Sequence, residues 1–245
     1  MVHTEFDCHS LCRETGIHLH CYLRLVKVAS EAVGTMFLVF AVVGSGMMAE
    51  SLTNDVALRL LINSAATVAM LYILINLLAP LSGAHFNPVV TLVSSFRREK
   101  NLREVTLYLV AQLIGAISGS LLAHLTFDIP FAISTRDRTG SHLLLAEVIA
   151  TFGLVVIVFA DWKRYRIRHR ASLIALWIGG AYFFTSSTSF ANPAVTIGRI
   201  FTDSFAGIAP VSVAPFIVAQ LVGAVLAWLA LRSIKSSLKA RGKAH

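Results

Sequence analysis

The stretch FNPVVT at Phe86–Thr91 decides how this chain folds, because it is repeated as ANPAVT at Ala191–Thr196. Each copy contains an asparagine, a favourable residue just before a helix, and then a proline, which is favourable in the first helical turn. About ten residues compatible with a helix follow, but each segment is too polar and too short to cross a membrane. We therefore expect two half-helices, which begin at Asn87 and Asn192.

Two further blocks recur in the same order in each half, so most of the chain is an internal repeat. EAVGTM at Glu31–Met36 matches EVIATF at Glu147–Phe152, and AQLIGA at Ala111–Ala116 matches AQLVGA at Ala219–Ala224. With three spans in each half, the second copy enters the membrane from the opposite side, which makes the repeat inverted. The functional site is then expected near the membrane midplane, where the two halves meet.

The composition indicates a membrane protein. Hydrophobic residues make up 56% and charged residues 14%, with a mean hydropathy of +0.72, whereas a soluble domain has about 25% charged residues. We expect an all-α membrane protein with six transmembrane helices and two re-entrant half-helices. The six expected spans are Val28–Ala49, Val56–Leu78, Val105–Phe127, His142–Ala160, Ala171–Ser186 and Val213–Leu231.

One membrane domain, residues 28–231, is expected between two tails. Its repeat halves are about 28–127 and 142–231. Residues 1–27 form an N-terminal tail, and residues 232–245 form a basic C-terminal tail. The first apolar run follows a polar stretch without a clear cleavage site, so it is interpreted as a retained span.

The positive charges indicate the orientation. The formal net charge is +8, which by itself is compatible with a nucleic-acid partner. In a six-span topology, however, 17 of the 21 Lys and Arg residues fall on one side, as the positive-inside rule requires of the cytoplasmic side. We expect a multi-pass protein of the cell's inner (plasma) membrane, with both termini cytoplasmic, membrane lipid as a partner and no nucleic acid. The basic run Lys163–Arg170 is interpreted as a solvated loop near anionic lipid.

The chemistry expected at the midplane favours neutral, hydroxylated solutes. Each half-helix N-terminus contributes about half a positive charge, which repels cations, including hydronium. The asparagine side chains can donate hydrogen bonds to a passing oxygen atom. Irregular backbone at this depth is tolerated where it lines a cavity, so Gly83, Ala84 and His85 are expected to supply pore-lining carbonyl oxygens.

Glu31 and Glu147 lie within expected spans, where an unpaired carboxylate costs several kcal/mol. Their equivalent places in the repeat predict one shared task. We expect them to accept hydrogen bonds from the N–H groups of the re-entrant loops as structural supports; proton coupling is the alternative. Gln112 and Gln220 are expected to hydrogen-bond between spans in the same way.

These motifs resemble those of the aquaporin and aquaglyceroporin family, the major intrinsic proteins, over nearly all of Glu31–Leu231. In that family the half-helices meet through NPA motifs; here the first is NPV and the second NPA. The motif residues are Asn87, Pro88, Val89, Asn192, Pro193 and Ala194. The resemblance implies an aquaporin fold and a passive channel for small uncharged solutes. It also implies a homotetramer with one pore per subunit, no cofactor and no enzymatic reaction.

The resemblance also implies a narrow filter at four positions, carried over by gapless counting from each asparagine. These positions are Thr67, Gly180, Ser189 and Val195. Val195 replaces the arginine that normally follows NPA, and Thr196 replaces the aspartate of the usual glycerol-channel pattern. Small side chains at all four positions imply a wider filter without a fixed charge. This pattern is similar to the bacterial branch associated with arsenic resistance, which implies arsenite or methylated arsenicals beside water and glycerol-like polyols.

Arg199 follows Val195 by four residues, so it lies on the same helical face, about 6 Å further out. One interpretation is a side chain that extends along apolar surface to the edge of the membrane. The other is a displaced cation that guards the outer mouth of the pore.

All three cysteines, Cys8, Cys12 and Cys21, lie in the N-terminal tail, which also contains four histidines. That density is compatible with soft-metal or trivalent-arsenic binding. The spacings match no zinc pattern well, and the cytoplasm keeps thiols reduced. A simple extension of the chain without a metal site is the other interpretation.

Two alternatives to a channel are open from the sequence. An ion-coupled secondary transporter also has inverted repeats and membrane glutamates, but its flux stops when the ion gradient is dissipated. A closed-pore structural membrane protein would show no solute flux. An enzyme is not expected, because no set of acid, base, nucleophile or metal ligands converges apart from the two glutamates.

Overall fold

The computed structural model of the protein describes residues 8–160 and 169–241, with side chains described from Tyr22 to Leu238 in that part of the chain. Every regular element in these ranges is a helix. The elements are α1 (Cys8–Leu52), α2 (Val56–Ser82), α3 (Pro88–Phe96), α4 (Leu102–Phe127), α5 (Ser141–Phe159), α6 (Arg170–Phe184), α7 (Pro193–Gly198), the 3-10 helix η1 (Arg199–Phe201) and α8 (Pro210–Arg241).

Within the described residues, the eight α-helices follow the predicted order of six spans and two half-helices. Five helices, α1, α2, α4, α5 and α8, are long and apolar enough to cross a membrane. Helix α6 is also apolar but has 15 residues, about 22 Å at 1.5 Å per residue. It begins one residue after residues 161–168, which lie outside the described residues and contain most of the predicted basic loop.

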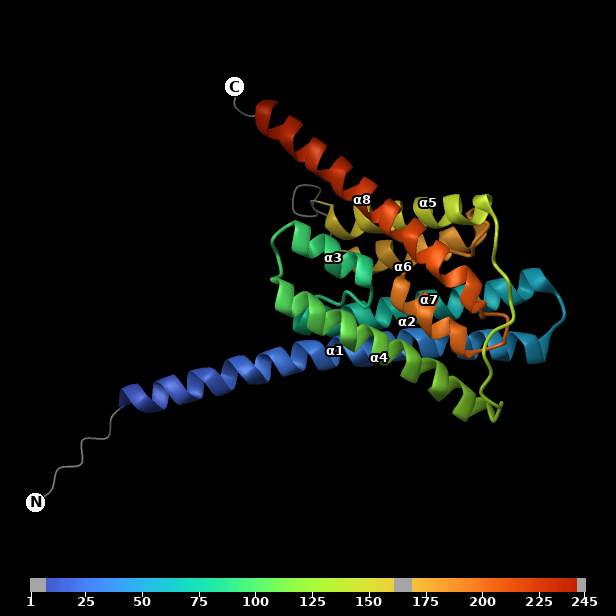
Figure 1. Ribbon diagram of the computed structural model, residues 1–245, viewed down its shortest axis with the longest axis horizontal. Coiled ribbons are helices and arrows are strands. Elements are labelled where there is room, and N and C mark those ends of the chain that lie inside the picture. The colour runs from blue at the N-terminus through green and yellow to red at the C-terminus, as the bar shows by residue number, and fades with distance from the viewer. Residues whose placement is uncertain (1–7, 161–168, 242–245) are drawn as a thin grey trace, which may run out of the picture.

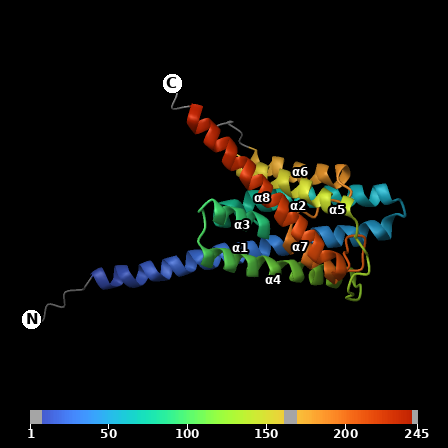
Figure 2. The ribbon, with the colours of Figure 1, turned by 45° about the horizontal axis from the view of Figure 1, so that its top comes forward.

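Helices α1 and α8 are longer than the spans predicted from hydropathy. Helix α1 runs unbroken from Cys8 past the expected boundary at residue 28, and α8 continues to Arg241. Hydropathy detects only the apolar part of a helix, because lysine, arginine and glutamate also sustain helical structure. Figures 1 and 2 both show these two extensions leaving the same end of the bundle, as an even number of spans requires.

The repeat is visible in the packing of the long helices. Helix α1 packs against α4, and α5 packs against α8 in the same way. The contacts need glycine at equivalent places. A Cβ atom added to Gly115 of α4 would overlap the carbonyl oxygen of Ala32, and one added to Gly223 of α8 would overlap that of Val148. Backbone therefore packs directly on backbone in both halves.

The two half-helices begin at the predicted asparagines. The Asn87 side chain accepts a hydrogen bond from the N–H of Val89 (3.0 Å) at the start of α3. The Asn192 side chain accepts from the N–H groups of Ala194 (2.9 Å) and Val195 (3.3 Å) at the start of α7. Both are N-caps followed by proline. Helix α7 has only six residues, and η1 continues it.

The loops before these helices have an unusual, repeated backbone conformation. Ala84 and Phe86 have φ angles of 51° and 48°, and Ser189 and Ala191 have 50° and 46°. Residues other than glycine rarely adopt this left-handed conformation, which costs about 1–3 kcal/mol each. Such a conformation persists only where the surroundings hold it, and the equivalent positions show that both loops are held alike.

Candidate functional site

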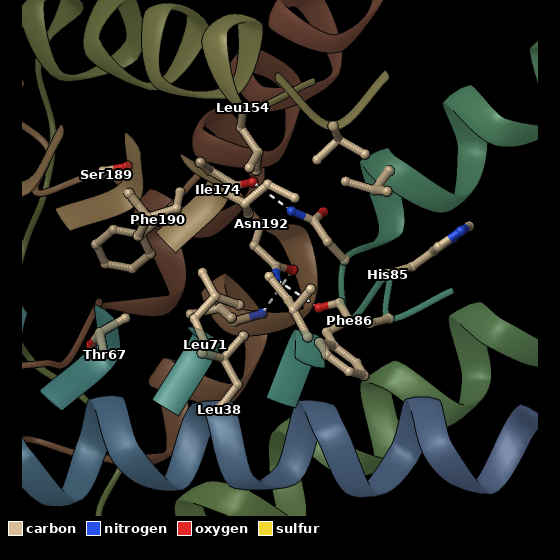
Figure 3. A pocket seen from close by; sticks show the side chains of 18 of the residues that line it. Leu38, Thr67, Leu71, His85, Phe86, Leu154, Ile174, Ser189, Phe190 and Asn192 are labelled. Carbon is tan, nitrogen blue, oxygen red and sulfur yellow. Dashed lines mark hydrogen bonds between the residues drawn. The ribbon is translucent and has the colours of Figure 1, made fainter. Parts of the chain in front are cut away.

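A cavity lies between the two loops and helices α1, α2, α5 and α6 (Figure 3). Along α6 its lining extends from Arg170 to Tyr182, about 18 Å at 1.5 Å per residue. Gly83, Ala84 and His85, the residues expected to supply carbonyl oxygens, are part of the lining. Apolar side chains form much of the rest, including Leu38, Leu71, Ile75, Leu154, Ile174 and Ile178. A solute in this cavity therefore contacts both hydrocarbon and polar groups.

Two asparagines join the repeats at the cavity. The Nδ2 atom of Asn87 donates to the carbonyl oxygen of Ala191, and the Nδ2 atom of Asn192 donates to that of Phe86, both at 2.8 Å. Figure 3 shows Asn192 and Phe86 meeting in this way, with the cavity around them. Each amide nitrogen has a second hydrogen, which no described residue accepts. Because both asparagines line the cavity, these hydrogens are available to a solute oxygen.

Glu31 holds the first loop from behind. Its carboxylate accepts hydrogen bonds from the backbone N–H groups of His85 (3.0 Å) and Phe86 (2.7 Å). It also accepts from the Ser82 hydroxyl (2.6 Å) and from Nε2 of Gln112 (2.8 Å). The glutamate is fully buried and is not part of the cavity lining. These bonds fix the loop in its left-handed conformation.

Glu147 holds the second loop with the same geometry. It accepts hydrogen bonds from the N–H groups of Phe190 (2.9 Å) and Ala191 (2.8 Å) and from Nε2 of Gln220 (2.7 Å). It is fully buried and, like its counterpart in the first repeat, does not line the cavity. This position suits a structural support, because a proton carrier would need contact with the cavity.

Three of the four expected filter residues line the cavity: Thr67, Ser189 and Val195. In Figure 3, Thr67 and Ser189 lie on one side of Asn192 and His85 lies on the other. The Ser189 side chain is buried, and its Oγ atom has no hydrogen-bond partner among the described residues. Burying an unpartnered hydroxyl costs free energy, and this residue lies in the wall of the cavity.

The structure corrects the fourth filter position. Gly180 is exposed and lies outside the cavity lining, whereas Ile178 and Tyr182 line it. Residues four apart share a helical face, and a residue two positions from each faces away, so gapless counting missed the cavity by two residues. Tyr182 was not predicted, although the four-residue spacing within α6 could have indicated it. Its hydroxyl lies 3.2 Å from Oγ1 of Thr67, so these two side chains form a polar pair.

Arg199 lies in the cavity wall and does not reach the membrane surface. Its side chain is only 2% exposed, and Nε donates a hydrogen bond to the carbonyl oxygen of Ala206. The guanidinium carbon lies 3.5 Å from the ring centroid of Phe190. The interpretation of Arg199 as a residue that extends to the surface is therefore wrong, because the loop carbonyl and the aromatic ring hold it inside.

The departure from NPA in the first motif does not alter the cavity. Val89 is fully buried and packs with Val93 and Val155, away from the lining. Ala194, its counterpart in the second motif, is also fully buried and does not line the cavity. The prolines of the two motifs, Pro88 and Pro193, occupy the first helical positions of α3 and α7.

The described side chains contain no group of three or more His, Cys, Asp or Glu residues that could hold a metal ion. The side chains of Cys8, Cys12 and Cys21 lie outside the described part of the chain. Metal or arsenic binding by the N-terminal tail therefore stays a hypothesis from the sequence.

Known proteins resemble this chain over most of its length. The family model described as major intrinsic protein matches residues 20–190 and 185–245. Aquaglyceroporin AqpS of Rhizobium meliloti (strain 1021) is 47% identical over 207 residues, which cover 84% of this chain and 88% of that protein. A probable TIP-type aquaporin of Medicago truncatula is 35% identical over 183 residues, covering 69% of this chain and 72% of that protein.

A solved structure shows the same fold. The X-ray structure of the aquaglyceroporin from Plasmodium falciparum matches with a TM-score of 0.64 and 20% identity, covering 84% of this chain and 94% of that one. Aquaporins and aquaglyceroporins are multi-pass membrane proteins and not enzymes, so the prediction that this chain is not an enzyme is confirmed by its relatives. The repeated motifs, the helices and these matches together show that the chain belongs to the major intrinsic protein family.

Proposed function

We propose that the protein is a passive channel for small uncharged solutes: water, glycerol-like polyols, and arsenite or methylated arsenicals. The observation that carries this proposal is the asparagine pair, Asn87 and Asn192, whose amide groups line a largely apolar cavity. A polyol can accept hydrogen bonds from the amides while its carbon atoms contact the apolar wall. The relatives named aquaporin and aquaglyceroporin support the same class of solute.

The filter that we propose consists of Thr67, Tyr182, Ser189 and Val195. Three of these residues offer hydroxyl groups and the fourth is apolar, so this ring carries no fixed charge. Neutral arsenite has three hydroxyl groups, and glycerol also has three, so both can exchange water for these hydroxyls. The unpartnered Oγ of Ser189 and the Thr67–Tyr182 pair support this assignment.

We also propose a homotetramer in the inner (plasma) membrane with both termini cytoplasmic. The excess of Lys and Arg on one side supports the orientation. Exposed apolar side chains on the outer faces of the helices, such as Leu77 (65%) and Leu125 (78%), support burial in lipid or against other subunits. In this arrangement residues 28–231 form the channel domain, and Glu31 and Glu147 serve as supports of its two loops.

Reconstituted liposomes test the proposal. Stopped-flow light scattering follows water and glycerol, and tracer uptake follows arsenite and a methylated arsenical. We expect rapid flux that needs no ion gradient. Val195→Arg should reduce glycerol and arsenite flux at least tenfold, because a long cation would occupy the filter ring.

Val195→Thr is the matched control, since it keeps the volume without adding charge and should retain glycerol flux. Flux that disappears with the ion gradient would indicate a coupled transporter instead. Absence of flux above protein-free liposomes would indicate a closed-pore structural protein. Water flux without glycerol flux in the unchanged protein would show that the proposed filter is wrong.

A further inference from the structure

Arg199 presents free hydrogen-bond donors to the cavity. Only its Nε atom is bound, to the carbonyl oxygen of Ala206; no described residue accepts a hydrogen bond from Nη1 or Nη2. The side chain is 98% buried and belongs to the cavity lining. The two unbound nitrogens of such a guanidinium group lie side by side, and together they can bind a carboxylate or a similar oxyanion.

In the described part of the chain, no carboxylate forms an ion pair with this arginine. The ion pairs between described residues are Arg97–Glu99 and Arg136–Glu50. The nearby aspartate Asp203 accepts hydrogen bonds from Thr135 instead. A buried cation without a counter-ion is costly, so the site is completed when an anion binds.

A second arginine, Arg138, binds the same loop as Arg199. Arg138 donates to the carbonyl oxygens of Gly207 (2.9 Å) and Phe205 (3.3 Å), on either side of the carbonyl that Arg199 binds. Its guanidinium carbon lies 5.1 Å from the centroid of Phe190, the ring that also contacts Arg199. Burial lowers the pKa of Arg138 to about 10, so it still adds positive charge at neutral pH.

We propose that Arg199 makes the end of the cavity opposite the chain termini a binding site for a small, singly charged oxyanion such as a monocarboxylate. Ser189, whose buried hydroxyl has no partner among the described residues, belongs to the lining of the same cavity. Because the site lies in the wall of the proposed solute route, a bound oxyanion obstructs that route. This consequence rests on the proposed channel function, whereas the binding itself does not.

Trifluoroacetate is a suitable probe, because it is a carboxylate that stays ionised at neutral pH and carries fluorine. Fluorine NMR relaxation of trifluoroacetate with the purified protein in detergent measures binding without any flux. We expect the protein to increase the relaxation rate at millimolar probe concentrations, and excess acetate to reverse the increase. Arg199→Gln, which keeps a donor for Ala206 but removes the charge, should abolish the effect.

Arg136→Gln is the matched control. It removes one positive charge at the same end of the molecule, but Arg136 is exposed, pairs with Glu50 and does not line the cavity. This variant should bind trifluoroacetate as the unchanged protein does. Binding by Arg199→Gln equal to that of the unchanged protein would overturn the proposal. If Arg199→Gln does not fold, Arg199→Met also removes the charge, and undiminished binding by it would equally overturn the proposal.

Glycerol flux in liposomes then tests whether the bound anion obstructs the solute route. Trifluoroacetate, compared with chloride at equal ionic strength, should lower the flux about two- to tenfold in the unchanged protein and in Arg136→Gln, but not in Arg199→Gln. Binding with undiminished glycerol flux would overturn the obstruction of the route. Arg199-dependent binding without any glycerol flux would refute the proposed channel and leave the anion site standing.

Discussion

The two re-entrant loops, residues 82–91 and 187–196, share a backbone but differ in the side chains that they offer to the cavity. Ala84 and Ser189 have φ angles of 51° and 50°, and Phe86 and Ala191 have 48° and 46°. A buried glutamate binds two N–H groups of each loop. The features that hold the loops are thus almost identical in the two halves.

The side chains that differ between the two halves include those that line the two mouths of the cavity. His85 of the first loop corresponds to Phe190 of the second, and Ala84 corresponds to Ser189. Ser94 of α3, which follows Val90 by four residues, corresponds to Arg199, which follows Val195 by four residues. Ser94 only binds the carbonyl oxygen of its own helix, whereas Arg199 lines the cavity. The matched glutamates therefore hold the two loops alike, whereas these unmatched residues distinguish the two mouths.

The largest expected effect comes from removing the supports. Glu31→Ala and Glu147→Ala should each lower stability by about 3–5 kcal/mol, because each leaves two loop N–H groups without an acceptor and removes one of the two acceptors of a buried glutamine. Thermal unfolding in detergent measures the loss. Glu31→Gln and Glu147→Gln keep one carbonyl oxygen and should lose less. A large loss of stability from only one of the two substitutions would show that the glutamates do not support the two loops equally.

A middle-sized effect is expected where the halves differ by one methyl group. Gly119 of α4 corresponds to Ala227 of α8, which is fully buried. Gly119→Ala should nevertheless destabilise the protein by about 1–3 kcal/mol, because the added Cβ would overlap the carbonyl oxygen of Met36. Ala227→Gly, which removes a methyl group, should cost about 1 kcal/mol. A neutral Gly119→Ala in thermal unfolding would show that α1 and α4 pack less tightly than the structure indicates.

The smallest effect is expected from making the first loop resemble the second. His85→Phe removes the hydrogen bond between Nδ1 and Oγ1 of Thr91 (3.0 Å), but that hydroxyl still accepts from Gln112 (3.0 Å). The loss should be about 1 kcal/mol or less in thermal unfolding, with glycerol flux within about a factor of two. A collapse of flux would instead mean that the imidazole itself contacts the solute.

The framework of the fold can be predicted from the sequence because it is set by local chemistry and by repetition. Asn-Pro marks the start of each half-helix at Asn87 and Asn192, and the structure has both helices starting there. Equivalent glutamates in apolar spans need donors, and loop N–H groups are the donors nearby in an inverted repeat. These inferences use only neighbours in sequence or symmetry between the halves.

The mouth opposite the chain termini was harder to predict because tertiary contacts decide it. Tyr182 was missed because gapless counting from Asn192 assumes a loop length that the chain does not have, and the cavity face of α6 falls two residues from Gly180. The sequence leaves two interpretations of Arg199 open, because the carbonyl that binds it, at Ala206, belongs to an irregular segment. No periodic pattern marks such a segment.

The crossed hydrogen bonds of the two asparagines have a consequence for synthesis of the protein. Asn87 binds a carbonyl oxygen 104 residues later in the chain. At about 5–20 residues per second, a ribosome needs roughly 5–20 seconds to supply that partner. During this interval the first half sits in the bilayer with its amide and the Phe86 carbonyl unsatisfied. Until the second half is synthesised, these groups therefore depend on water or on the insertion machinery for hydrogen bonds.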